Sequence, residues 1–418
     1  MAWLDKLHHP EKFIKTFLKW GLLGLIMGVL GGLIGAGFHH ALHFVTHVRG
    51  EYTWLIFLLP VGGLFTVALY KFLKLQNNKG TNEIIDATLD GHPVSPAVFP
   101  GIFLATVITH LFGGSAGREG AALQLGGSTA SCLARVFRMN QRSQKLMVMC
   151  GMAAVFAGLF GTPLTAMLFC MEFVSVGTVL SPALLPCFLG AYVASRVSLC
   201  FGVHAEGTLL VNTLGVDILT LGKVTALAVA ISALGIAMCA FFHKAEHFAH
   251  HRIPNPFVRI ALGGGVVMVL TLIVGDHRFN GAVMDMALKA VEGETDWYSF
   301  ALKMLFTAVT LAAGFKGGEI VPTFCIGATF GCLLGGFLGL DAGICGALGL
   351  IGLFCCATNS PIASIVLSIE MFGGANLYLF SLVCVICFVL SGNCGLYVSQ
   401  IIQFDKADLK ENHFDRAK

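Results

Sequence analysis

The sequence predicts an all-α, polytopic membrane protein built from two homologous repeats of broken and tilted helices. Of its 418 residues, 56% are hydrophobic and only 12% are charged, and the mean hydropathy is +0.81. A soluble domain of this length does not need so much apolar sequence. Several apolar segments are shorter than the roughly 20 residues of a full span and are interrupted by Gly or Pro. Such segments are stable at membrane depth only where they line a cavity or are buried in protein.

Composition also excludes several classes of function. The net charge of +3 is too small to indicate nucleic-acid binding. The 14 cysteines follow no framework spacing, and the CxxC at residues 384–387 lies in an apolar run without a second pair. We therefore interpret the cysteines as small packing residues and expect neither a metal nor another cofactor. The 51 glycines fit helices that pack tightly in a bilayer.

The first half, residues 1–212, is predicted to form one repeat. Residues 1–19 carry four lysines, which indicates an amphipathic segment at the membrane surface. A long apolar helix follows at residues 18–48, where Gly24, Gly28 and Gly32 recur every four residues and predict a close helix contact. The other apolar segments are residues 54–73, 96–112, 147–160, 163–173 and 182–201, with a polar stretch at 76–92.

The second half, residues 213–403, repeats this organisation, and residues 404–418 form a charged tail. The apolar segments of this second half are residues 223–242, 257–274, 298–313, 320–338, 342–354, 361–372 and 377–402. Three motif pairs match across the halves at a separation of about 200 residues. They are FHHALHFVTH with FHKAEHFAHH (38–47 and 242–251), GREG with GGEI (117–120 and 317–320), and GTPLTAMLFCME with NSPIASIVLSIE (161–172 and 359–370). Paired halves with short, broken segments at matching places indicate a transporter whose site lies at the repeat interface.

The stretch GGSAGREGAALQLGG, residues 113–127, is the strongest candidate for that site. It places Arg118 and Glu119 among glycines within apolar sequence, where a charged pair is costly and indicates function. The run AALQL can begin a helix, and the free N–H groups of a helix start bind anions. The carboxylate of Glu119 is itself an anion, so it can occupy the site until it is protonated or displaced. The alternative is a buried structural pair of Arg118 with Glu119.

Other residues are open to more than one interpretation. His39, His43 and His47 share one helix face, which fits either a metal site or histidines at the membrane interface. GGSAG, residues 113–117, fits the GxSxG pattern of an enzyme nucleophile, with Ser115 as the nucleophile. That pattern acts on a strand-to-helix turn above a sheet, whereas a predicted membrane helix precedes Ser115, so we expect no enzyme.

Two glutamates, Glu172 and Glu370, each follow a proline by nine residues in matching motifs. We expect them to mark the membrane interface or to pair with a basic residue.

Several motifs resemble those of the CLC family of chloride channels and transporters. GREGA at residues 117–121 resembles the GREGP motif, GGEIVP at 317–322 resembles GxFxP, and GLYVSQI at 395–401 resembles the segment with the pore tyrosine. The resemblance implies a CLC-type fold with inverted repeats, a homodimer with one pore per subunit, and an anion held by helix N-termini near mid-membrane. It implies gating by Glu119. The anion-binding residues that it implies are Gly80, Thr81, Gly117, Arg118, Gly120, Gly318, Glu319, Ile320, Val321 and Tyr397.

The departures from the family pattern bear on which ion is carried. GTNEI at residues 80–84 replaces GSGIP, so Thr81 stands at the anion-coordinating serine, and Phe173 replaces the internal proton glutamate of the transporters. The GGE motif and the replaced GSGIP resemble the fluoride-exporting branch. That branch usually has threonine where Val321 stands and phenylalanine where Cys325 stands. Because the residues next to the ion set its discrimination, we expect chloride transport, gated by Glu119; the alternative is a fluoride/proton antiporter for fluoride export.

The loop RVFRMNQRSQK, residues 135–145, predicts the orientation of the chain. It carries four basic residues and no acid, so the positive-inside rule places it in the cytoplasm. We expect a multi-pass integral protein of a bacterial inner or plasma membrane that carries chloride or fluoride, exchanges protons and contacts the lipid bilayer.

Overall fold

The computed structural model describes residues 10–204, 211–403 and 406, and within them the fold is all-α, as predicted. Residues 1–9 of the expected surface segment, part of the link between the halves and nearly all of the charged tail lie outside the described residues. The helices of the first half are α1 (Pro10–Glu51), α2 (Leu59–Phe72), α3 (Thr81–Asp90), α4 (Val98–Leu111), α5 (Glu119–Val136), α6 (Gln141–Phe160), α7 (Pro163–Glu172) and α8 (Leu184–Cys200).

The second half contributes eight further α-helices within the described residues. They are α9 (Ile218–Arg252), α10 (Pro256–Val274), α11 (Met284–Val291), α12 (Ser299–Ala313), α13 (Ile320–Phe337), α14 (Ala342–Thr358), α15 (Pro361–Phe372) and α16 (Leu377–Leu390). Two short 3-10 helices, η2 (Thr53–Leu58) and η3 (Ser181–Ala183), precede α2 and α8. The strands β1 (Ser175–Val176) and β2 (Ile401–Ile402) pair in parallel and tie the two halves together.

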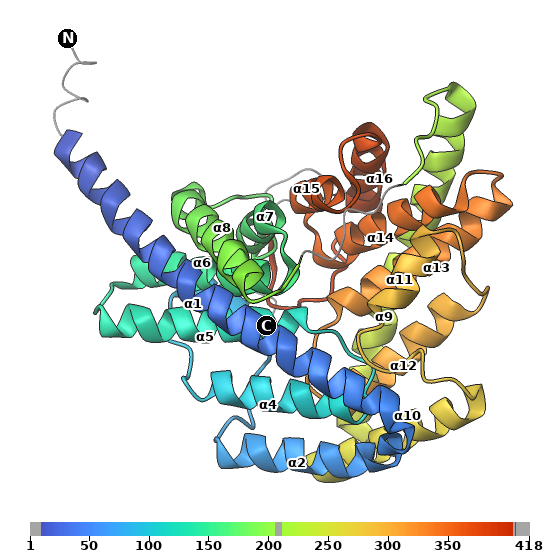
Figure 1. The fold of residues 1–418 in the computed structure, drawn as a ribbon, viewed down its shortest axis with the longest axis horizontal. Coiled ribbons are helices and arrows are strands. Elements are labelled where there is room, and N and C mark those ends of the chain that lie inside the picture. Colours follow the sequence, from blue (N-terminus) through green and yellow to red (C-terminus); the bar gives the residue numbers. More distant parts are fainter. Residues whose placement is uncertain (1–9, 205–210, 404–405, 407–418) are drawn as a thin grey trace.

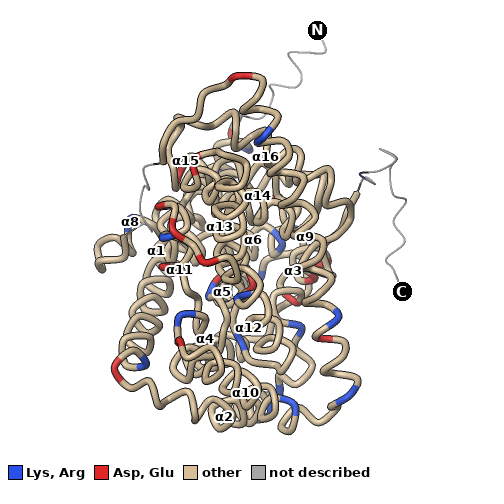
Figure 2. Tube along the Cα trace, turned by 90° about the vertical axis from the view of Figure 1, so that its right-hand side faces the viewer, with Lys and Arg blue, Asp and Glu red and all other residues tan. Residues whose placement is uncertain are grey.

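The protein is a multi-pass membrane protein. Among the described residues, seven helical segments are long and apolar enough to cross a bilayer. Helix α1 has 42 residues, so at 1.5 Å per residue it is about 63 Å long and must tilt strongly across a hydrocarbon layer of about 30 Å. It is the long blue diagonal of Figure 1. Most of the trace in Figure 2 carries no charge, yet acidic and basic positions occur amid the helices beside α5.

Close contact between α1 and α8 follows the glycine pattern, as the sequence predicts. A Cβ added at Gly28 would lie 2.7 Å from Val193 Cβ, and one added at Gly32 would lie 2.6 Å from Val197 Cβ. At Gly24 the same atom would lie 3.1 Å from Leu189 Cβ. Only glycine lets the two helices approach this closely, and the contact anchors the first half.

Three segments differ from the sequence expectation. Residues 10–19, which were expected to belong to a surface segment, form the first turns of α1 and continue without a break into the apolar helix. The polar stretch at 76–92 contains helix α3, which buries Ile84 and Ile85 completely and begins and ends at glycines with positive φ. The apolar segment at 377–402 is helical only as far as Leu390, since Gly392 takes a φ of 56°. Tyr397 therefore lies on a loop, which frees its backbone from helix geometry.

The two halves exchange equivalent contacts. Glu172, at the end of α7, accepts hydrogen bonds from the first free N–H groups of α15, at Ile362 (3.0 Å) and Ala363 (2.8 Å). Glu370, at the end of α15, accepts in return from Leu164 (2.9 Å) and Thr165 (2.8 Å) at the start of α7. The partners of both glutamates are helix-start N–H groups rather than the basic residue that was one of the two expectations. The sequence pattern hid this because each cap comes from the other repeat.

This reciprocal capping predicts a matched pair of stability losses. Glu370→Ala removes the acceptor of three hydrogen bonds, including one from Thr165 Oγ1 (2.6 Å). We expect it to lower the free energy of unfolding by about 1–2 kcal/mol, and Glu172→Ala to do the same, because free N–H groups and an uncompensated helix dipole remain. Thermal unfolding in detergent measures this. Glu51→Ala, at an exposed end of α1, is the control; equal midpoints for all three variants would contradict the capping role.

The orientation of the loop 135–145 is a second prediction of this architecture. In the structure Gln141 and Lys145 hold the loop against the C-terminal end of α3 through the carbonyls of Asp90 and Leu89. We expect Ser143→Cys to resist an impermeant thiol reagent in intact cells and to react after permeabilisation, because a cluster of basic residues is retained on the cytoplasmic side. The background carries serine at Cys132, Cys200 and Cys394, the cysteines that are not buried. Labelling in intact cells would contradict the assignment.

Candidate functional site

Glu119 lies between the N-termini of two helices. It is the first residue of α5 and is completely buried. One carboxylate oxygen accepts from the N–H of Val321, in the first turn of α13, and the other accepts from the N–H of Arg118. Both donors are helix-start N–H groups that have no partner within their own helix, and the partial positive charge of each helix start favours an anion there. The carboxylate thus occupies a ready-made anion site.

Paired glycines bring these helix starts together. Gly117 and Gly318 form an antiparallel bridge, in which Gly117 donates to Gly318 O (2.7 Å) and Gly318 donates to Gly117 O (2.9 Å). Each glycine lies two residues before the first residue of its helix, Gly117 before α5 and Gly318 before α13, so the bridge joins the two helix starts. A Cβ at Gly318 would lie 2.7 Å from Glu119 Oε2, and one at Gly117 would overlap both carboxylate oxygens. The cradle exists because neither position has a side chain.

The start of α3 approaches the same point from the other side. A Cβ at Gly120 would lie 3.0 Å from the hydroxyl oxygen of Thr81 and 3.1 Å from Gly317 O. Thr81 is the first residue of α3, after Gly80, whose φ is 66°. The structure therefore brings the predicted residues Gly80, Thr81, Gly117, Arg118, Gly120, Gly318, Glu319, Ile320 and Val321 together around Glu119.

Tyr397 reaches the site from the loop after α16. Its side chain is 5% exposed, and its hydroxyl has no hydrogen-bond partner among the described residues. Phe173 packs edge-on against its ring, at 5.6 Å between centroids, so an apolar side chain fills the position of the transporters' internal glutamate. A buried hydroxyl without a protein partner is a donor available to a ligand.

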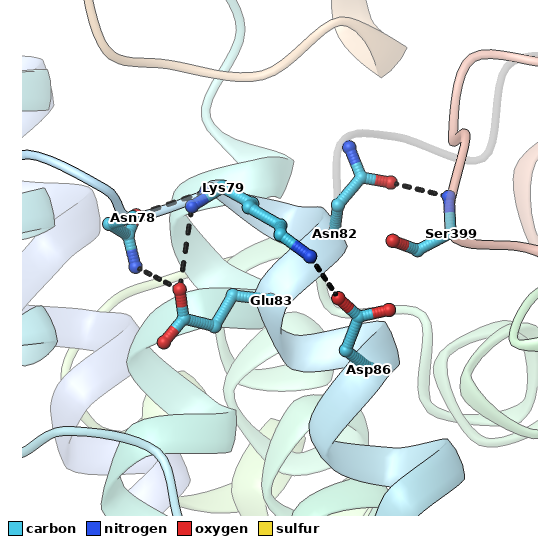
Figure 3. Close-up of polar contacts among 7 residues, drawn as sticks. Asn78, Lys79, Asn82, Glu83, Asp86 and Ser399 are labelled. Atoms are coloured by element: carbon cyan, nitrogen blue, oxygen red, sulfur yellow. Dashed lines mark hydrogen bonds and ion pairs between the residues drawn. The ribbon is translucent and has the colours of Figure 1, made fainter. Parts of the chain in front are cut away.

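The residues that replace GSGIP fix the geometry of α3 and of the tyrosine loop. Figure 3 shows Asn82 accepting from Ser399 N–H (3.0 Å), which joins the start of α3 to the loop of Tyr397. It also shows Glu83 accepting from Asn78 Nδ2 (3.1 Å), while Lys79 pairs with Asp86. The role of Asn82 depends on a contact more than 300 residues away in sequence, so sequence reasoning missed it.

Two cavities approach the gate position from different sides. The wider one, about 1000 Å³, is lined by Arg118 and Val321, and we call it the wide cavity. The other, about 530 Å³, is lined by Gly80, Thr81, Gly317, Glu319 and Tyr397, and we call it the narrow cavity. They share no lining residue, and the buried carboxylate of Glu119 lies between residues of one and residues of the other. The Glu119 side chain therefore lies between the wide cavity and the narrow cavity.

Glu319 lines the narrow cavity and does not cap α13 with its side chain. Lys316 lies nearby, with its ammonium 4.7 Å from the centre of the Tyr70 ring. Gln124, one turn into α5, also lines this cavity; its Nε2 donates to Gly120 O (3.1 Å) and its Oε1 has no partner among the described residues. Lys316 and Gln124 were not predicted, although a lysine directly before GGE was a visible signal.

The structure gives no support to the two alternative interpretations, an enzyme nucleophile at Ser115 and a metal site. Ser115 lies on the loop between α4 and α5, and its hydroxyl contacts Thr307 Oγ1 (3.1 Å) and Lys303 Nζ (2.9 Å). The first strand of the described residues, β1, begins at Ser175, after Ser115 in the chain. Ser115 therefore does not lie on the strand-to-helix turn that the GxSxG pattern requires. Within the described residues no group of His, Cys, Asp or Glu has a metal-binding arrangement.

Comparison with known proteins gives the family. A family model described as "Voltage gated chloride channel" matches residues 62–392. A "Chloride/fluoride channel protein" of Pseudomonas syringae pv. tomato is 31% identical over 96% of this chain and 91% of its own length. The "Voltage-gated ClC-type chloride channel ClcB" of Escherichia coli O17:K52:H18 is 27% identical over 88% of this chain and 95% of its own length.

Solved structures agree in fold. The crystal structure of a CLC-type fluoride/proton antiporter superposes with a TM-score of 0.89 at 30% identity, over 92% of this chain and 98% of that one. A slow cyanobacterial Cl-/H+ antiporter superposes with a TM-score of 0.72 at 21% identity, over 90% and 94% of the two chains.

Fold and site together define a membrane protein that moves anions through a two-repeat helical body, and not an enzyme. The chain belongs to the voltage gated chloride channel, or CLC, family, with features of its fluoride branch. CLC-type anion transport is therefore its function.

Proposed function

We propose that the protein is a fluoride/proton antiporter in which Glu119 is both gate and proton carrier. The observation that carries this proposal is the buried carboxylate of Glu119, held by the N–H groups of Arg118 and Val321 between two cavities. When Glu119 is protonated it loses the negative charge that those groups hold. The two N–H groups then become available to an anion, so anion binding and protonation of the glutamate favour each other.

Fluoride is preferred to chloride here, although the sequence alone favoured chloride. That expectation rested on Val321 and Cys325. Both side chains are buried, at 1% and 0% exposure, and Val321 serves the site through its backbone N–H, which any non-proline residue supplies. The contact that Val321 makes with the site is thus the same for valine and for threonine. The 30% identity to a fluoride/proton antiporter over nearly the whole chain supports fluoride.

The narrow cavity supplies the donors that fluoride needs. Fluoride holds its water tightly, so its site must replace hydration with strong, well-placed donors. The hydroxyls of Thr81 and Tyr397 line this cavity, and the Tyr397 hydroxyl has no protein partner among the described residues. Glu319, a second carboxyl group on the same cavity, is the group we propose for proton exchange in place of the internal glutamate that Phe173 replaces.

Chloride transport remains the second candidate. The observation that favours it is the 27% identity to a ClC-type chloride channel over 88% of this chain. We also propose that the chain acts as a homodimer, as the family resemblance implies. Both cavities and the gate belong to one chain, so each subunit would carry its own pore.

Glu119→Gln tests the gate. The amide imitates the protonated carboxyl and cannot exchange a proton, so we expect halide flux in liposomes to continue while proton movement driven by a halide gradient disappears. Glu51→Gln, at the exposed end of α1 and away from the gate, is the matched control and should keep both fluxes. Unchanged proton coupling in Glu119→Gln would refute the gating role.

Parallel flux measurements with fluoride and chloride test the ion. We expect fluoride to leave liposomes at least about tenfold faster than chloride. Protons should enter the liposomes in exchange for the fluoride that leaves. Thr81→Ala should slow fluoride by about tenfold, since one hydrogen bond to the ion is lost. Thr88→Ala, which removes a buried hydroxyl of α3 that donates to Ile84 O (2.8 Å), is the control for folding. Chloride flux equal to or above fluoride flux would reverse the choice.

A further inference from the structure

Two cations beside the wide cavity, Arg49 and Lys303, donate hydrogen bonds to neutral groups. Arg49 donates to His110 O (2.8 Å) and Asn280 O (3.3 Å). Lys303, completely buried, donates to Gly281 O (2.7 Å), Ser115 Oγ (2.9 Å) and Phe279 O (3.3 Å). All of these partners are neutral. Buried charges are normally compensated by opposite charge, so this region favours a bound anion.

His110, in the last turn of α4, lies beside these cations. Its side chain is 2% exposed and it lines the wide cavity. Its Nδ1 lies 2.9 Å from Thr106 O. A carbonyl oxygen only accepts, so Nδ1 carries a hydrogen and, in the neutral ring, Nε2 is a bare acceptor. Nε2 has no partner among the described residues, and a buried polar atom left in this way points to a ligand.

The charge of a bound anion decides whether this ring takes up a proton. Arg49 donates to the carbonyl oxygen of His110, and Arg118 lines the same cavity, so burial and the neighbouring positive charges both oppose a proton on Nε2. A halide beside the ring offsets that repulsion, and Nε2–H then donates to the halide. If proton and halide bound together, the net charge of the site would be unchanged and each would raise the affinity for the other.

Other charged and titratable groups also line this cavity. From α1, His39 faces the cavity half-buried and His43 is exposed. The acids Asp285, Glu294 and Asp296 line it from α11 and the loop that follows. Asp296 pairs with Arg278 (2.5 Å). His277 and Lys289 come from the same part of the chain.

We propose that the wide cavity contains a second anion site, at His110 and Arg118 with Arg49 and Lys303 behind them, in which His110 Nε2 takes up one proton as a halide binds. This site goes beyond the proposed gate, and it rests on the proposed function only in taking the ion to be a halide. It would load a halide and a proton together on one side of Glu119.

Calorimetric titration of sodium fluoride and sodium chloride into the purified protein tests this proposal. The titrations are done between about pH 5 and pH 7 in two buffers of different ionisation enthalpy. The difference in heat between the two buffers gives the number of protons that the protein takes up on binding. The Glu119→Gln background removes the gate carboxyl from the count. We expect uptake of close to one proton per protein molecule at halide saturation in this background, and halide affinity that weakens about tenfold when the uptake is lost.

Two substitutions of His110 separate function from folding. His110→Asn keeps a donor for Thr106 O but lacks an atom at Nε2, and His110→Gln places an amide there that cannot take up a proton; both should abolish the uptake. His43→Gln, the same change at an exposed position of the cavity, should retain it. Uptake that survives His110→Asn belongs to another group such as Glu319, and uptake lost in His39→Gln instead belongs to His39; either result overturns the proposal.

The calorimetric result for the His110 site can be told apart from the flux result for the proposed fluoride/proton antiport. If reconstituted wild-type protein passes no halide, the proposed function fails, while the titration needs no membrane and still decides the His110 site. If halide flux is normal and the Glu119→Gln protein binds halide without proton uptake, the His110 site fails and the proposed function stands.

Discussion

The burial of one carboxylate between two helix starts is the constraint on which this structure depends. No water reaches Glu119, so its charge has to be stabilised by fixed dipoles. The N–H groups of Arg118 and Val321 supply them, and they come from different repeats. Neither repeat could hold the carboxylate alone. The bridge between Gly117 and Gly318 sets the separation of the two helix starts, and it leaves room for the carboxylate because neither residue has a Cβ.

The same physical requirement recurs away from the site. A helix that begins inside a bilayer has free N–H groups that cannot be left without acceptors. Helices α7 and α15 are both short, and each receives its cap from the glutamate at the end of the other. Glu119 differs from Glu172 and Glu370 in its surroundings, because two cavities reach the neighbourhood of its carboxylate, and we propose that this cap can be displaced. A structural cap and a gate are therefore closely related arrangements in this fold.

The departures from the family motifs gain a physical explanation in the fold. Asn82 fastens the start of α3 to the loop of Tyr397, and Glu83 holds the turn that precedes α3. The replaced motif thus positions Thr81 and Tyr397 relative to each other. Phe173 closes the position of the missing internal glutamate with an aromatic contact, so a proton that crosses the protein requires another group. Glu319 and His110 lie on opposite cavities, and our proposals give them this part of the chemistry.

The sequence alone determined the class of fold, the repeat and the residues around Glu119. Apolar content, glycine spacing and motif separation are local or periodic properties, and they directly reflect bilayer thickness and helix packing. Only the tertiary structure decided which groups face each other. It showed that Glu172 and Glu370 exchange caps, that Asn82 holds the tyrosine loop, and that His110 lies beside Arg49 and Lys303. These contacts join residues far apart in the chain, and their energy depends on distance and burial, which are properties of the folded protein and leave no periodic trace in the sequence.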